Sequence, residues 1–130
     1  MGWWEVVLKN LDVGDILFTP GRGLQGSRSK PFKIVLKSPS AINIASGNSV
    51  VPLERLCFDT IQEAYSENPL LWLRVASLHD NEPFENSLDK LVREATGSQL
   101  ARGNYICSIL EHCGLVRYTM QGNKKGIQAA

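Results

Sequence analysis

The stretch "SLDKLVREATGSQLARGNYICSILEHCGLVRYTMQGNKKG" (residues 87–126) decides the fold of the C-terminal part of this 130-residue chain. Apolar residues recur at helical spacing over 88–95 and again over 106–113, which predicts two helices. Gly97 and Gly114 follow these patterns and are expected to end the helices, because glycine adopts the left-handed conformation of a helix C-terminus without steric cost. The segments "LVRYTM" and "GIQAA", on either side of "QGNKKG", predict two paired strands.

The segments before this stretch extend the pattern. Apolar residues at helical spacing predict a helix over 53–65, and the apolar run over 70–79 predicts a buried or half-buried strand. Either Asn86 or Ser87 can cap the next helix, since both side chains accept hydrogen bonds from the first free amides. Asp89 is expected on the solvent side of that helix.

The first part of the chain is predicted to be rich in β-structure. Short apolar runs predict strands over 3–8 and 15–19, and "PFKIVLKSPSAINIAS" predicts a hairpin over 31–46. In the hairpin, Phe32, Ile34 and Leu36 alternate with Lys33, Val35 and Lys37, so one face of the hairpin should be buried and the other should carry lysines.

These patterns together predict an α+β protein. Residues 1–50 would form a small β-rich half, either an SH3-like barrel or a meander, packed on a mostly helical half over residues 51–130. At 130 residues the two halves could equally share one core and form a single cooperative domain.

The order expected from residue 53 onward is helix, strand, helix, short turn, helix, strand, basic turn, strand. This order over residues 53–130 resembles the winged helix-turn-helix domains of bacterial regulators. The resemblance implies DNA binding, with residues 102–113 as the recognition helix and the basic turn as the tip of the wing. By this resemblance, the residues on or near the exposed face of the helix would be Arg102, Asn104, Tyr105 and Ser108, and the wing tip would carry Lys124 and Lys125. Arg102 and Asn104 could instead be turn and capping residues at a surface.

The distribution of charge adds a second basic element. Residues 1–53 carry six Lys/Arg against three Asp/Glu and residues 95–130 carry four against one, whereas residues 54–94 carry four against nine. The two basic ends are either separate solvated faces or one surface that binds anions. In the N-terminal basic part, the segment "TPGRGLQGSRSKP" (residues 19–31) contains Arg22, Arg28 and Lys30 and no acidic residue. This composition suits contact with a phosphate backbone.

Other chemistries are less well supported by the sequence. Cys57, Cys107 and Cys113 lie in apolar stretches, as reduced, buried thiols do, and no metal-ligand spacing or hydrolase motif is present. No apolar run approaches the ~20 residues needed to cross a bilayer, and the N-terminus does not resemble a secretory leader. We therefore expect a cytoplasmic protein that is not an enzyme and uses no cofactor or metal.

The sequence leaves two kinds of partner open. The first hypothesis is that the protein binds nucleic acid through the residues named above. The resemblance makes DNA the expected nucleic acid. The second is a protein-interaction or self-associating module, which would use the edge of the C-terminal hairpin and whichever of Trp3 and Trp4 faces outward from the first predicted strand.

Overall fold

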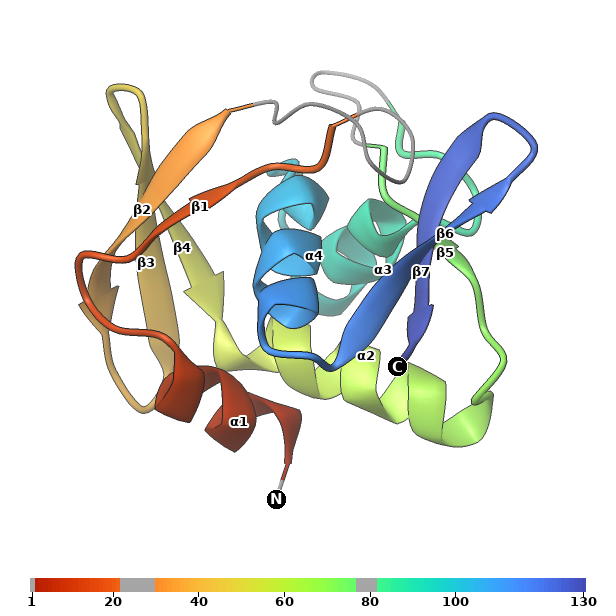
Figure 1. Cartoon of the computed structure of the whole chain (residues 1–130), viewed down its shortest axis with the longest axis horizontal. Helices are drawn as coiled ribbons and strands as arrows, with labels where there is room; N and C mark the ends of the chain where they lie inside the picture. Colours follow the sequence, from red (N-terminus) through yellow and green to blue (C-terminus); the bar gives the residue numbers. More distant parts are fainter. Residues whose placement is uncertain (1, 22–29, 77–81) are drawn as a thin grey trace.

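The fold has two small sheets with helices between and beneath them (Figure 1). It is taken from a computed structural model that describes residues 2–21, 30–76 and 82–130. In chain order, the described elements are α1 (Trp3–Asn10), β1 (Ile16–Phe18), β2 (Pro31–Lys37), β3 (Ala41–Ser46), β4 (Ser49–Glu54), α2 (Arg55–Glu67), β5 (Leu73–Arg74), α3 (Leu88–Thr96), α4 (Gly103–His112), β6 (Val116–Gln121) and β7 (Lys124–Ala129). The α+β class predicted from the sequence is confirmed.

The chain begins with a helix, so the strand predicted over residues 3–8 is wrong. Trp4, Val7 and Leu11 are buried, and their spacing follows the turn of a helix rather than the alternation of a strand. The Trp4 indole donates a hydrogen bond to the Pro39 carbonyl at 3.0 Å. Trp3 is half-buried and stacks on the Tyr65 ring. Neither tryptophan therefore offers the outward-facing strand position expected from the sequence.

The first sheet is an open antiparallel meander with the strand order β1-β2-β3-β4, and its described strands do not close into a barrel. The hairpin expected over residues 31–46 is confirmed as β2 and β3. The expected burial of Leu36 is wrong, because a bulge between Ile34 and Leu36 interrupts the alternation of the two faces. Val35 and Leu36 are consequently both exposed.

The helix predicted over residues 53–65 begins two residues later than expected. Leu53 belongs to β4, where its side chain is buried under the first sheet, and Leu56 is 50% exposed on α2. Pro52 fits this strand because β4 lies at the edge of the sheet. A proline there, which has no backbone N–H, need not remove a hydrogen bond between neighbouring strands. β4 also runs across the boundary placed between residues 50 and 51, so the first sheet takes residues from both expected halves.

The C-terminal part follows the predicted order of elements. Ser87 caps α3 by accepting a hydrogen bond from the Lys90 amide, and Gly97 ends that helix with a φ of 68°. The predicted hairpin is confirmed as β6 and β7, and the second sheet has the order β5-β7-β6. Of the strand predicted over 70–79, only Leu73–Arg74 is a strand among the described residues.

A continuous hydrophobic core connects the two sheets. It includes Ile34 and Ile44 from the first sheet, Phe58 from α2, Ile109 from α4 and Ile127 from β7, all fully buried. In Figure 1, α4 lies between the two sheets. The helix expected to read DNA is therefore an interior element of the fold.

Candidate functional site

Arg102 is buried at the start of α4, where the resemblance placed an exposed, base-reading side chain. Only 1% of it is accessible. Its guanidinium donates hydrogen bonds to the Pro52 carbonyl at 2.9 Å and to Thr96 Oγ1 at 3.0 Å, and it forms an ion pair with Glu54. Arg102 therefore connects β4 to the end of α3, and the expectation that it faces solvent is wrong.

The first amides of α4 are also occupied. Asp89 on α3 is buried, and its Oδ1 accepts hydrogen bonds from the Arg102 amide at 3.1 Å and the Gly103 amide at 3.4 Å. Its other carboxylate oxygen pairs with Arg93 at 2.9 Å. The solvent-facing position expected for Asp89 is therefore wrong. A side-chain carboxylate already fills the place at this helix N-terminus where a phosphate could otherwise bind.

The middle of α4 is covered by the first sheet. Tyr105 is half-buried, with its ring packed edge-on against Phe32 at 5.2 Å between ring centres. Ser108 is buried and its hydroxyl donates a hydrogen bond to the Phe18 carbonyl at 2.6 Å. Asn104 is half-exposed. Because β1 and β2 cover this face, the prediction that Tyr105 and Ser108 lie on an open helix surface is wrong.

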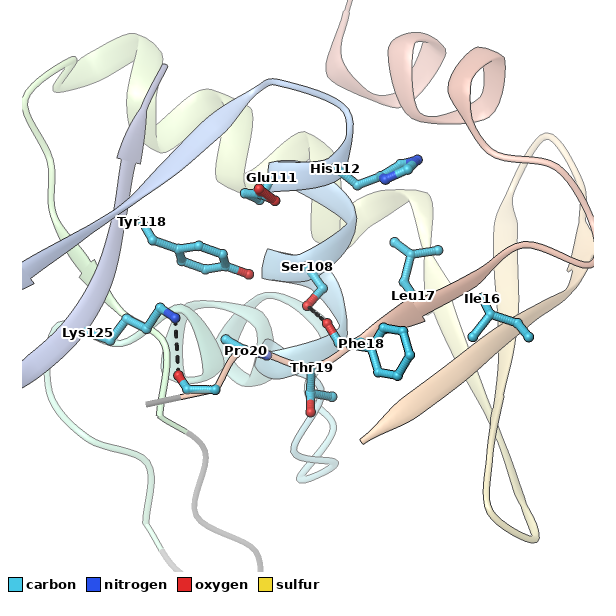
Figure 2. Close-up of a pocket in the computed structure, with 11 residues that line it drawn as sticks. Ile16, Leu17, Phe18, Thr19, Pro20, Ser108, Glu111, His112, Tyr118 and Lys125 are labelled. Atoms are coloured by element: carbon cyan, nitrogen blue, oxygen red, sulfur yellow. Dashed lines mark hydrogen bonds between the residues drawn. The ribbon is translucent and has the colours of Figure 1, made fainter. Parts of the chain in front are cut away.

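A groove of about 350 Å³ opens where β1, α4 and the second sheet meet (Figure 2). Its lining comes from β1 and the residues that follow it, from α4, and from β6 and β7, which are distant in sequence. The lining residues are Ile16, Leu17, Phe18, Thr19, Pro20, Gly21, Ser108, Glu111, His112, Tyr118 and Lys125. Two residues predicted as nucleic-acid contacts, Ser108 and Lys125, thus lie in one depression.

The basic C-terminal turn meets the segment that follows β1 at this groove. The Lys125 ammonium donates a hydrogen bond to the Gly21 carbonyl at 3.1 Å, across 104 residues of sequence. The Lys30 backbone is hydrogen-bonded to Thr19, which lines the groove. The structure therefore brings the ends of the two basic segments together.

The two lysines of the turn have different surroundings. Lys124 is exposed, whereas Lys125 is half-buried, with its ammonium 4.4 Å from the centre of the Tyr118 ring. Tyr118 and Lys125 meet because Tyr118 pairs with Ile127, which places Lys125 diagonally opposite it on the same face. Lys30 is exposed. Arg22 and Arg28 lie outside the described residues.

Burial changes the titration of the groups in and beneath the groove. Desolvation lowers the pKa of Lys125 below its ordinary value, although the nearby Glu111 carboxylate acts to raise it. Desolvation also raises the pKa of Tyr118 and raises that of Cys107 to about 12. Near neutral pH the Tyr118 phenol and the Cys107 thiol therefore keep their protons, and the phenol donates toward the Cys107 sulfur at 3.9 Å.

Glu111, His112 and Tyr118 line the groove but were not among the predicted site residues. One local signal existed for two of them: Ser108, Glu111 and His112 are spaced i, i+3 and i+4, which places them on one face of a helix. Nothing local indicated that this face turns toward Gly21 and Lys125, because that arrangement depends on contacts between distant segments.

Comparisons of the chain with models of protein families, with curated proteins and with solved structures found no match. Among residues 2–21, 30–76 and 82–130, no helix has the length and apolar character needed to cross a membrane. The same residues contain no group of three or more His, Cys, Asp or Glu side chains placed to hold a metal ion.

Proposed function

We propose that this protein binds nucleic acid, DNA in the first instance, without catalysing a reaction. The contact surface would be formed by the β6–β7 turn together with Gly21 and Lys30. The observation that carries the proposal is the hydrogen bond from Lys125 to the Gly21 carbonyl, because it joins two basic segments that the sequence keeps far apart. The β6–β7 turn and the start of β2 both lie along the upper edge of the molecule in Figure 1.

Two exposed lysines would make the phosphate contacts. These are Lys30 and Lys124, which form no ion pair with any residue that the structure describes. The Lys30 backbone is bonded to Thr19, and Lys124 precedes Lys125 on β7, so each lysine adjoins in the chain or by a backbone bond a residue that lines the groove. Lysines of this kind bind a phosphate as point charges and release the counterions condensed on the nucleic acid. Their contribution to affinity would be largely independent of base sequence.

The arrangement of the C-terminal elements supports the proposal that residues 53–130 form a winged-helix domain. The order from α2 to β7 is helix, strand, helix, helix, strand, strand, and β7 lies between β5 and β6. We do not propose α4 as the reading element, since β1 and β2 cover its middle and Asp89 occupies its first amides. The proposed contacts belong to the turn and the groove instead.

A second candidate function is association with a protein or with another copy of the chain. The outer face of the first sheet supports it, because one row of paired residues crosses that face as Ile16, Lys33, Ala45 and Val50. Ile16 and Val50 are 61% and 63% exposed. Exposed apolar residues on a sheet face are typical of interaction surfaces when they gather into a patch.

Fluorescence anisotropy with labelled duplex and single-stranded oligonucleotides, each at about 50 and 200 mM salt, tests the first function. We expect Lys30→Ala and Lys124→Ala each to weaken binding to all sequences and to reduce the salt slope by about one. Lys9→Ala is the matched control, since Lys9 is exposed on α1 at the opposite edge of the molecule and should leave the slope unchanged.

Two results would contradict the proposal. One is the absence of binding at the lower salt concentration, and the other is an equal effect of all three alanine substitutions. A mass that rises with protein concentration, in a protein without affinity for any oligonucleotide, would favour the second candidate function.

A further inference from the structure

The second sheet has one face toward the core and one outer face. Leu73, Val116 and Ile127 point into the core, so the residues that alternate with them along the strands point outward. In Figure 1, α3 and α4 lie on one side of this sheet. The outer face carries Arg74 from β5, Arg117, Thr119 and Gln121 from β6, and Lys124, Gly126 and Gln128 from β7. None of these strand residues is acidic, so the outer face attracts an anionic partner.

The Trp72 indole lies on this outer face with one side of its ring against Gly126. A Cβ added to Gly126 would lie closest to the indole atom Cε2, and slightly farther from Cζ2 and Nε1, which are bonded to Cε2. A carbon placed beside the ring edge would be nearer to one of those neighbours than to Cε2, so the added Cβ would lie over the face of the ring. The opposite face of the indole therefore points away from the sheet. Trp72 is half-buried, so part of it stays accessible.

Two exposed cations flank the position of the indole. Gly126 pairs with Thr119, and this pair lies midway along the hairpin between the positions of two basic residues, Arg117 and Lys124. Four residues of strand and one strand spacing separate the two cations, so their backbone positions are about 14 Å apart. Arg117, like Lys124, forms no ion pair within the described ranges.

Arg74 adds a second planar group to the outer face. It lies two residues after the tryptophan, which places both side chains on the same side of an extended strand. Its guanidinium carbon is 3.7 Å from the centre of the Phe84 ring. The two acids near Phe84 in sequence act on α3: Glu85 forms a hydrogen-bonded ion pair with Lys90 that raises the pKa of Lys90, and the charge of Glu82 raises it further. The positive charge of Lys90 thus offsets these acids.

This combination of an aromatic ring face and flanking cations matches a single strand of nucleic acid. Every base has a flat face that can stack on an aromatic ring, whereas the bases of a duplex are already stacked on one another. We infer that the outer face of the second sheet binds a single strand, with one base stacked on Trp72 and the neighbouring phosphates at Arg117 and Lys124. The inference rests on the proposed nucleic-acid binding and extends its contact surface from the β6–β7 turn across the second sheet.

Fluorescence anisotropy with two labelled probes of the same length tests the stacking. One probe is oligo-dT, and the other is an oligomer of abasic nucleotides, which keeps the phosphates but has no bases. We expect the parent to bind oligo-dT about fivefold or more tightly than the abasic oligomer, as the stacking of one base on an aromatic ring provides. Trp72→Leu should bring this ratio close to one, and Trp72→Phe should retain most of it.

Arg117→Ala tests the phosphate contact at an exposed position, where the substitution disturbs no packing. It should weaken binding to both probes equally and reduce the salt slope by about 0.7, the value for one phosphate of a single strand. Lys33→Ala is the matched control, since Lys33 is an exposed cation on β2 in the first sheet and should leave the affinity and the slope unchanged. Far-UV circular dichroism checks the folding of each variant. If Trp72→Leu does not fold, the ratio in the parent and the slope of Arg117→Ala decide.

The outcomes separate this inference from the proposed function. A ratio of about five or more that Trp72→Leu abolishes, with a slope that changes in Arg117→Ala and not in Lys33→Ala, supports the inference. Salt-dependent binding of the two probes with equal affinity, or equal effects of Arg117→Ala and Lys33→Ala, overturns it and leaves the proposed function standing. An oligo-glutamate that binds as tightly as oligo-dT would identify an acidic peptide as the partner of this face and also overturn it. Failure of every oligonucleotide to bind at low salt overturns both.

Discussion

The position of the Arg102 side chain decides whether the start of α4 could contact the bases of a nucleic acid. From the sequence it could point outward beside Asn104, but its guanidinium finds acceptors in β4 and α3 and is buried among them. A buried guanidinium must be paired and hydrogen-bonded to offset its lost hydration. The acceptors that satisfy it come from residues up to 50 positions away. Arg102 is consequently part of the scaffold.

Gly126 is required by the close approach of Trp72. It lies in β7, and a Cβ added to it would overlap the Trp72 indole. We expect Gly126→Ala to lower the free energy of unfolding by about 1–3 kcal/mol through overpacking. Urea denaturation followed by far-UV circular dichroism measures this change.

A double-mutant cycle with Trp72→Leu identifies the cause. If the overlap with the indole is responsible, Gly126→Ala should lower the free energy of unfolding by less in the Trp72→Leu background than in the parent. The coupling energy between the two substitutions should be about 1 kcal/mol or more. Additive effects of Gly126→Ala and Trp72→Leu would show that the overlap is not the source of the instability.

At the scale of elements, α3 and α4 form from local signals, and their neighbours determine which faces are available. Ser87 and Gly97 define α3 through a cap and a left-handed terminus. The burial of α4 depends instead on β1, which reaches it through the Phe18 carbonyl. The start of α3 can therefore be tested by a local substitution.

Ser87→Ala removes the side-chain oxygen that accepts the Lys90 amide at 3.0 Å. We expect the free energy of unfolding to fall by about 1 kcal/mol, the usual cost of losing an N-terminal cap. Ser66→Ala is the control, since Ser66 is exposed near the end of α2 and should change stability by less than about 0.5 kcal/mol. Chemical denaturation of the two variants beside the parent gives both values. Equal values for the two serines would rule out the cap as a source of stability.

At the scale of the whole molecule, the two sheets share one core and β4 continues directly into α2. We therefore expect both sheets to unfold in one transition. A variant with Trp3 and Trp4 replaced by Phe leaves Trp72 to report on the second sheet, and Trp72→Phe leaves Trp3 and Trp4 to report near the first. In each variant the midpoint from fluorescence should match the midpoint from far-UV circular dichroism. Separate midpoints would indicate two independently folding units.

The sequence by itself determined the elements whose patterns are long or clearly terminated. These were α3 with its cap, α4, the β2–β3 hairpin and the β6–β7 hairpin, and with them the α+β class. Local patterns worked there because helix periodicity, glycine stops and turn residues act within a few positions. Over residues 3–8 the run was too short for its apolar residues to distinguish a helix from a strand.

Only the tertiary structure decided which side chains are available for function. Arg102, Asp89 and Ser108 are polar and read as surface residues, yet each is buried because a distant segment supplies its hydrogen-bond partner. The meeting of Gly21 with Lys125, and the groove formed there, likewise depends on contacts across most of the chain. Periodicity records which face of an element is apolar, but the identity of the segment that covers a face is set by long-range packing, which no local pattern contains.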